Sequence, residues 1–332
     1  MKRDLAPWRL CAICFVLLVL AGCATRPSGP LAFVTNERDG TITVIDTATD
    51  QSVSTIKIGG RLRGIRLSPD RNRIWVAISY PTNQSQGEDK IAELDLNGNI
   101  IAKYEAGTDP ENFVIDDNAT RLYIANEDAG TASITDVKAN RVIATMPVGL
   151  EPEGAAMSPD GRWVYITSEA SSTVSVIDTH TGEVVKTFLV GARPREAAFS
   201  ADSTRAYVTA ENGNVVSVVD TKDHTVMKTI ELPRGNDAAQ LKPKGVVVSP
   251  DGKRVYVATG RGNSVAVIDG EHLTLLTLIP VGQRPWGIAL TPDGRKLYTA
   301  NGVSNDVSVI DTNTNKVIAT IKAGIGPWGI AL

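Results

Sequence analysis

The sequence has few of the residues that usually carry catalysis or covalent cross-links. Among 332 residues only three are cysteine and three are histidine, and aromatic residues make up 5%. Cys11, Cys14 and Cys23 all lie near the N-terminus, so the rest of the chain has no thiol for a disulfide, a metal or a nucleophile. The formal net charge of −3 argues against binding to nucleic acid through a general basic surface.

The only long apolar run lies at the N-terminus, behind a basic head that contains Lys2, Arg3 and Arg9. It is too short to span a membrane comfortably and is typical of a secretory signal. The run ends in LAGC, which resembles the bacterial lipobox, where a lipid is attached to the cysteine and the preceding peptide is removed. We therefore predict that Cys23 is lipidated. An ordinary export signal or an uncleaved anchor is the alternative.

Three segments follow from this prediction. Residues 1–22 are the signal peptide, residues 23–30 are the lipidated cysteine and a polar tether, and residues 31–332 are the folded domain. The predicted location is the bacterial periplasm, with the membrane as a partner through the lipid. Ala24 favours the outer membrane under the sorting rule of enteric bacteria.

A repeat with a period of about 42 residues runs through the folded domain. Each copy contains a predicted strand that ends in VID or a similar sequence. The aspartates that end these strands mark the repeat, and they are Asp46, Asp95, Asp136, Asp178, Asp220, Asp269 and Asp311. Seven copies at this period match the four-stranded blade of a β-propeller. We predict an all-β, seven-bladed propeller of four-stranded antiparallel blades.

One repeat shows the four strands, named A to D from the axis outwards. A small-residue strand beginning at Pro152 is followed by a PDG turn and by a β-rich strand from Trp163. The alternating TVSVID strand then ends at Asp178, whose side chain can cap the next turn before an outer VVKTFLV strand.

The first and last segments complete one another. Residues 31–57 supply strands B, C and D without an A strand, whereas GPWGIAL at residues 326–332 is an A strand without a blade. Joining them closes the ring and removes open strand edges.

The connections from D to A and from B to C share one face, here called the upper face. Two repeats are longer than the others, and both insertions fall on this face, at Pro81–Lys90 and Leu232–Lys242. Loops built up on one side of a rigid scaffold favour that side as the functional one.

The histidines His180, His224 and His272 lie near turns of the opposite face, in different blades, so they cannot converge on a metal or act together as a general base.

The A strands begin at the upper mouth of the axial channel, where charged and aromatic residues gather. The candidate binding residues are Arg61, Arg63, Glu111, Glu153, Arg193, Arg195, Lys242, Lys244, Arg284, Trp286 and Trp328. Such a mouth could hold an anionic aromatic ligand or a charged loop of a partner protein. The alternatives are that the charges neutralise one another and that the tryptophans pack against inner strands. Acidic pairs such as Glu151 and Glu153 are expected to be paired or solvated, so no metal is predicted.

The strand motifs FVTN (Phe33–Asn36), YIAN (Tyr123–Asn126), YVTA (Tyr207–Ala210) and YTAN (Tyr298–Asn301) resemble the YVTN family of β-propeller repeats. The stretches VGLEPEGAAMSPDG and VGQRPWGIALTPDG are similar to the periplasmic propellers associated with PQQ-dependent alcohol catabolism. The resemblance implies an accessory protein linked with a quinoprotein dehydrogenase or a transporter component. It supplies no catalytic residues.

Three functions compete on this basis. The favoured one is a non-enzymatic, membrane-tethered binding or scaffold propeller, a monomer that needs no cofactor and binds no nucleic acid, with PQQ or a related quinone as a candidate ligand. The alternative is a propeller enzyme, either a lactonase-like or lyase-like hydrolase or a quinoprotein-type oxidoreductase. A third hypothesis is a surface protein that uses the ring as a spacer.

Overall fold

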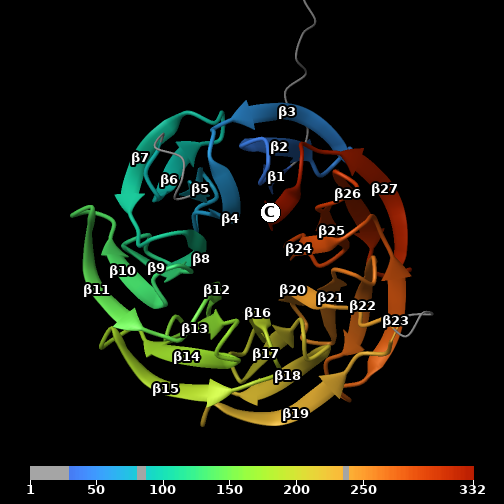
Figure 1. Ribbon diagram of the computed structural model, residues 1–332. Coiled ribbons are helices and arrows are strands. Elements are labelled where there is room, and N and C mark those ends of the chain that lie inside the picture. The colour runs from blue at the N-terminus through green and yellow to red at the C-terminus, as the bar shows by residue number, and fades with distance from the viewer. Residues whose placement is uncertain (1–29, 81–86, 235–238) are drawn as a thin grey trace, which may run out of the picture.

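The computed structural model describes residues 30–80, 87–234 and 239–332. The predicted signal peptide, Cys23 and most of the tether lie outside these residues, as do the centres of both long upper-face loops. The described residues form 28 strands in seven four-stranded sheets arranged as a ring (Figure 1). No helix among them is long and apolar enough to cross a membrane. The predicted seven-bladed all-β propeller is confirmed.

Each blade is listed here from its inner A strand to its outer D strand. Blades 1 to 3 comprise β28 (Pro327–Ala331), β1 (Leu31–Asn36), β2 (Thr41–Asp46), β3 (Gln51–Lys57); β4 (Arg61–Leu67), β5 (Arg73–Ser79), β6 (Lys90–Asp95), β7 (Ile100–Glu105); and β8 (Pro110–Ile115), β9 (Arg121–Asn126), β10 (Thr131–Asp136), β11 (Arg141–Pro147).

Blades 4 to 7 follow the same order without exception. They comprise β12 (Pro152–Met157), β13 (Trp163–Ser168), β14 (Thr173–Asp178), β15 (Glu183–Leu189); β16 (Pro194–Phe199), β17 (Arg205–Ala210), β18 (Val215–Asp220), β19 (Thr225–Glu231); β20 (Pro243–Val248), β21 (Arg254–Thr259), β22 (Ser264–Asp269), β23 (Leu275–Pro280); and β24 (Pro285–Leu290), β25 (Lys296–Asn301), β26 (Asp306–Asp311), β27 (Lys316–Lys322).

Ring closure occurs where the two ends of the chain meet. Strand β28 pairs antiparallel with β1, with Val34 opposite Ile330 and Phe33 opposite Ala331. The amide of Gly329 donates to Thr35 Oγ1 at 2.9 Å. The ring is therefore closed by strand pairing between residues that are almost 300 positions apart, as the two incomplete repeats predict.

The turns of the lower face follow the local chemistry of the sequence. In the turns between A and B of blades 2 and 4 to 7, a serine or threonine hydroxyl donates to the aspartate two residues later, as in Ser68 to Asp70 at 2.6 Å and Ser249 to Asp251 at 2.6 Å. This hydrogen bond lowers the pKa of both aspartates. In the turns between C and D, the marker aspartate accepts from the backbone, as Asp178 does from the amide of His180 at 2.8 Å. Its predicted capping role is confirmed.

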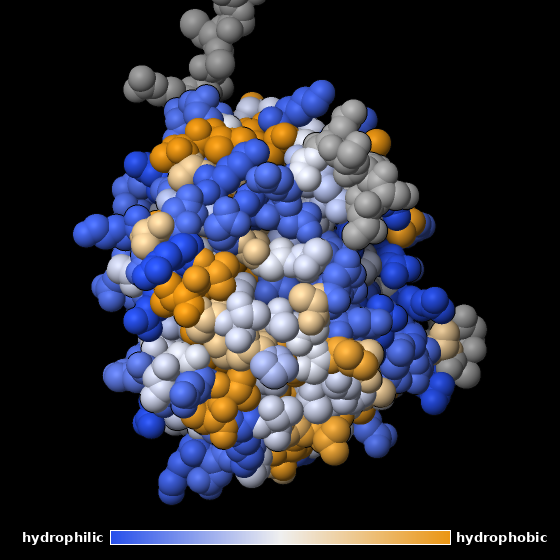
Figure 2. Space-filling view, turned by 60° about the vertical axis from the view of Figure 1, so that its left-hand side comes forward, coloured by the Kyte–Doolittle hydropathy of each residue, from blue (hydrophilic) through white to orange (hydrophobic). Residues whose placement is uncertain are grey.

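The core lies between neighbouring blades and is built mainly from the B and C strands. Tyr165, Tyr207 and Trp75 are almost fully buried there, and Trp163 packs against the same layer. The outer D strands alternate, so some apolar side chains face solvent, among them Ile101, Val142 and Leu189. Figure 2 shows this as separate apolar patches divided by polar residues.

Candidate functional site

Seven side chains ring the upper end of the axial channel, one from the equivalent position of each A strand. They are Arg63, Glu111, Glu153, Arg195, Lys244, Trp286 and Trp328. Glu111, Glu153, Arg195 and Lys244 are each no more than 5% exposed, although all four are charged. The structure thus brings together seven of the candidate residues as an inner ring, because they occupy the same position in the seven A strands that surround the axis.

The other candidates, Arg61, Arg193, Lys242 and Arg284, lie two residues earlier and form an outer rim. In blades 3 to 7 the rim residue has a left-handed backbone, with φ between 49° and 60°. Its carbonyl accepts from the amide that follows the B strand, as Arg193 does from Glu211 at 2.8 Å and Lys242 from Gly260 at 2.8 Å. The same conformation recurs at turns of the lower face, such as Arg71 and His224, so it is a feature of the repeat and does not by itself mark a binding site.

Four further carboxylates complete the mouth, and the sequence analysis missed them. Glu37, Glu127, Glu169 and Glu211 each follow the last residue of a B strand, where the chain turns into the loop to strand C. The signal that would have found them is the residue after each YVTN-like motif, which is glutamate in these four blades and glycine in blades 6 and 7.

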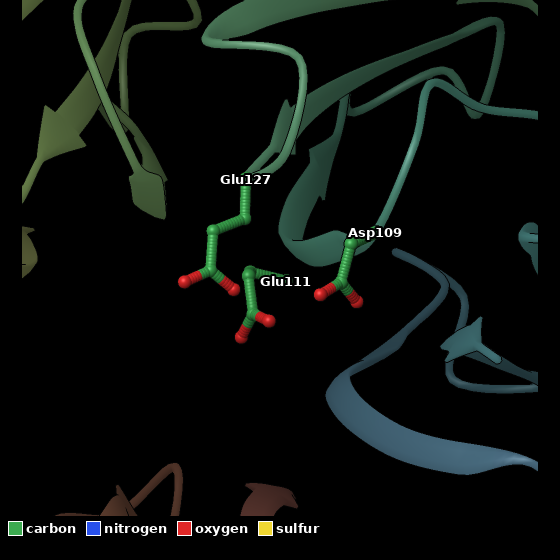
Figure 3. A group of neighbouring side chains, drawn as sticks. All are labelled: Asp109, Glu111 and Glu127. Carbon is green, nitrogen blue, oxygen red and sulfur yellow. The ribbon is translucent and has the colours of Figure 1, made fainter. Parts of the chain in front are cut away.

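The first charged cluster joins blades 1, 2 and 3. Figure 3 shows Asp109, Glu111 and Glu127 pointing toward one another, with one oxygen of each within 4.8 Å of the others. Two arginines meet these acids: Arg61 Nη1 lies 3.3 Å from Asp109 Oδ2, and Arg63 Nη1 contacts Glu111 Oε2. Because Arg63 already engages the most buried carboxylate, the geometry of three acids alone carries no metal assignment.

Charge in the first cluster is unbalanced. Glu37 also belongs to it, with Oε1 3.1 Å from Arg63 Nε, so four carboxylates face two guanidinium groups. Burial, together with the nearby Glu153 and Asp109 carboxylates, raises the pKa of Glu127 to about 7. A carboxyl that keeps its proton near neutrality relieves part of the excess negative charge.

We expect Glu127→Gln to change how stability depends on pH. The folded protein holds the Glu127 proton up to about pH 7, whereas the unfolded chain releases it near its ordinary value, so stability falls as pH rises from about 4.5 to about 7. Glutamine removes this loss and should stabilise the protein above pH 7 by on the order of 1–3 kcal/mol.

Urea unfolding at pH 5 and pH 8 measures the effect of this substitution. Asp128→Asn is the matched control because Asp128 is the exposed neighbour and lies outside the cluster. A Glu127→Gln protein with the same pH dependence as the parent would contradict the assignment.

The second charged cluster joins blades 4, 5 and 6 around Arg195. Its guanidinium lies 2.6 Å from Glu153 Oε1, contacts Glu169 Oε1 and lies 3.7 Å from Glu211 Oε2. From the rim, Arg193 Nε reaches Glu169 Oε2 at 2.6 Å. Three carboxylates therefore face two guanidinium groups and the Lys244 amine, so ion pairing, the alternative given above, accounts for most of the charge in this half of the mouth.

Lys244 is the most perturbed cation of the mouth. Its Nζ lies 3.1 Å from Glu211 Oε2 and 3.5 Å from the centroid of the Trp286 ring. Burial and the nearby Arg195 lower the pKa of Lys244 to about 7, although Glu211 opposes this shift. A large part of the amine is therefore neutral at physiological pH and can accept a proton, which an ordinary lysine cannot do.

Glycine after the B strands of blades 6 and 7 makes room for Lys244 and Trp286. A Cβ on Gly260 would lie 2.8 Å from Lys244 Cε, and one on Gly302 would lie 2.8 Å from Trp286 Cδ1. The rings of Trp286 and Trp328 lie side by side, with centroids 6.2 Å apart and planes at 29°. In blades 6 and 7 the glycine thus replaces a carboxylate with space that the Lys244 and Trp286 side chains occupy.

Two small cavities adjoin the tryptophan pair. One, of about 20 Å³, is lined by Glu153, Arg195, Lys244 and both tryptophans, and has the size of a single water molecule. The other, of about 190 Å³, opens on the upper face between blades 7 and 1. Both share Trp286 and Trp328, so the aromatic pair connects the charged ring with the surface.

A larger chamber of about 730 Å³ occupies the lower half of the channel and is lined mainly by apolar residues of the A strands, together with residues of the turns that follow them. At its inner end Arg66 Nη2 lies 3.6 Å from Glu196 Oε1, which also accepts from Asn112 Nδ2 at 3.1 Å. Burial raises the pKa of Glu196. This pair separates the lower chamber from the mouth.

Residues 185–322 match the family model described as Lactonase, 7-bladed beta-propeller. This match covers less than half of the chain, but the matched segment contains Arg193, Arg195, Lys242, Lys244 and Trp286. No curated protein matches the chain.

Solved structures are similar over most of the chain. Hydrazine synthase of Kuenenia stuttgartiensis has a TM-score of 0.75 at 21% identity, covering 86% of this chain and 93% of that one. A protein of Lactobacillus plantarum has a TM-score of 0.76 at 18% identity, with coverages of 90% and 98%. A Bacteroides fragilis protein provisionally named a 6-phosphogluconolactonase has a TM-score of 0.74 at 17% identity, with coverages of 91% and 98%. At these identities the likeness shows the propeller fold alone.

Proposed function

We propose that the protein is a hydrolase of small lactones and that the upper mouth is its active site. The observation that carries the proposal is the buried Lys244 amine, with a pKa near 7, beside Arg195, Glu211 and Trp286. The match of this segment to the lactonase model supports the same reaction class. The enzyme alternative therefore has more support than the non-enzymatic interpretation that the sequence favoured.

Lactone hydrolysis needs a base to activate water and a positive group to stabilise the oxyanion that forms at the carbonyl. Neutral Lys244 would accept the proton of the attacking water, for which the adjoining cavity of about 20 Å³ has the right size. Arg195, held in place by Glu153 and Glu169, would stabilise the developing charge. Water adds to the carbonyl carbon, the ring C–O bond breaks, and the alkoxide takes the proton back from Lys244.

Turnover of a panel of five- and six-membered lactones tests the proposal. We expect ring opening that persists after treatment with EDTA, because Arg61 and Arg63 already engage the acidic cluster and no step above uses a metal. Absence of turnover across the panel would reject the proposal. Turnover abolished by EDTA and restored by a divalent cation would move the chemistry to the first cluster.

A second candidate is the binding or scaffold propeller expected from the sequence. The specific observation in its favour is that Lys244 and Arg195 are only 3% and 5% exposed, which leaves little room for a substrate beside them. In that case a partner loop or a quinone would contact the rim. The protein would be held at the membrane by the predicted lipid on Cys23 and would assist PQQ-dependent alcohol oxidation. Native mass spectrometry of the protein from its own cells, showing a lipidated mass with a bound dehydrogenase, permease subunit or quinone, would support this function.

A further inference from the structure

The cleft of about 190 Å³ between blades 7 and 1 differs from the rest of the mouth in its charge. Arg38 and Arg284 lie at its walls, and among the described residues neither has a carboxylate within ion-pair distance. In contrast, Arg61, Arg63, Arg193, Arg195 and Lys244 all lie close to acids. Within the described part of the chain, Lys242 on the rim has only an amide acceptor, Asn212 Oδ1 at 2.7 Å, and it lies alone, whereas Arg38 and Arg284 bring two cations without a carboxylate partner to one cleft.

Glu37 also lines the cleft, but its carboxylate is engaged by the neighbouring blade. Its Oε1 lies 3.4 Å from Arg61 Nε and 3.1 Å from Arg63 Nε. The two guanidinium groups of Arg38 and Arg284 therefore determine which ligand charge the cleft favours. An anion placed there would gain charge-assisted hydrogen bonds from planar, fork-shaped donors.

The inner wall of the cleft is aromatic. Trp286 and Trp328 both line it, and the Arg284 guanidinium lies 5.2 Å from the centroid of the Trp286 ring. Two glycines keep the space open: a Cβ on Gly302 would meet Trp286 at 2.8 Å, and one on Gly326 would meet Arg38 Cγ at 3.0 Å. A flat ring can contact the tryptophans, whereas a bulky ligand cannot enter. The volume is below the roughly 300–1,000 Å³ of pockets for drug-sized ligands.

We infer that this cleft is a binding site for a small planar carboxylate, a ring acid of about the size of benzoate. The ring would pack against Trp286 and Trp328, and the carboxylate would bind Arg38 and Arg284. The inference depends only on the cleft and holds whether or not the mouth is catalytic.

Titration with benzoate, followed by tryptophan fluorescence and calorimetry, tests this site. Benzyl alcohol has the ring without the charge, and acetate has the charge without the ring, so each should bind at least tenfold more weakly than benzoate. Inorganic phosphate should also bind more weakly. Phosphate binding equal to that of benzoate would overturn the role of the ring, and no benzoate binding at millimolar concentration would overturn the site.

Substitutions of residues that line the cleft test whether benzoate binds there. Arg38→Gln and Arg284→Gln should each weaken benzoate at least tenfold, whereas Arg141→Gln, on exposed strand β11, should leave it unchanged. Val303 lines the cleft and is 47% exposed, so Val303→Glu adds a repelling charge with little risk to folding. It should weaken benzoate strongly, and Val303→Gln should not. Equal binding by the glutamate and glutamine variants would overturn the inference.

Discussion

Removal of residues 326–332 is expected to lower the melting temperature by more than about 10 °C and to broaden the unfolding transition. Trp328, Ile330 and Ala331 are each at most 8% exposed, and β28 covers the inner edge of β1. Loss of one buried tryptophan and one buried isoleucine costs on the order of 5 kcal/mol or more. That is a large part of the roughly 5–15 kcal/mol that stabilises a typical protein.

Differential scanning calorimetry of the truncated protein measures this effect. A synthetic peptide of residues 326–332 supplied in excess should restore much of the lost stability, because it can pair with the vacant edge of β1. The same peptide with Ile330→Pro should fail, since proline in the pairing segment disrupts the strand. An unchanged melting temperature in the truncated protein would show that β28 does not hold the ring together.

Lys244→Met is expected to reduce kcat/KM for a lactone substrate by on the order of 10²–10⁴-fold, the usual contribution of a general base. The parent rate should rise with pH through about 7, as the Lys244 amine loses its proton. Lys244→Arg should be equally inactive, because a guanidinium keeps its charge and cannot accept the proton. Lys253→Met, on the exposed lower face, is the control that should retain activity.

The stability of the same variants provides a readout that does not depend on turnover. Since burial lowers the folded-state pKa of Lys244, the folded protein binds fewer protons than the unfolded chain between about pH 7 and pH 10, and stability falls as pH drops across this range. Lys244→Met should lose this component of the pH dependence. A fully active Lys244→Arg enzyme with the parent pH profile would rule out Lys244 as the base.

The ring and its closure could be predicted from the sequence because their causes are local and repeated. The marker aspartates such as Asp178 and the alternating C strands occur in all seven blades, and the PDG turn occurs in three of them. The incomplete repeats at the two ends can bury both of their open strand edges only by pairing with each other, and β28 does pair with β1.

The mouth could be predicted only in part. The sequence placed Arg193 and Arg195 together at one site, and both contact Glu169, but it could not show that Arg193 lies on the rim while Arg195 is buried in the ring. Pairing could not be deduced, because Arg195 contacts Glu153 and Glu169 of blade 4 as well as Glu211 of its own blade. Such contacts depend on the paths that long side chains take from one blade to the next. No short sequence motif specifies these paths.

The point where the chain enters the ring determines which face of the propeller lies next to anything attached to the N-terminal segment. Strand β1 begins at Leu31 on the lower face, where the Pro30 carbonyl accepts from Thr47 Oγ1 at 2.7 Å, and ends near Glu37 at the mouth. The strand is about 20 Å long, so anything joined ahead of Pro30 attaches at the opposite end of the channel from the mouth. A bead or a fusion partner attached close to Pro30 would therefore lie on the side of the ring away from the mouth, and the mouth would stay open to molecules that arrive by diffusion.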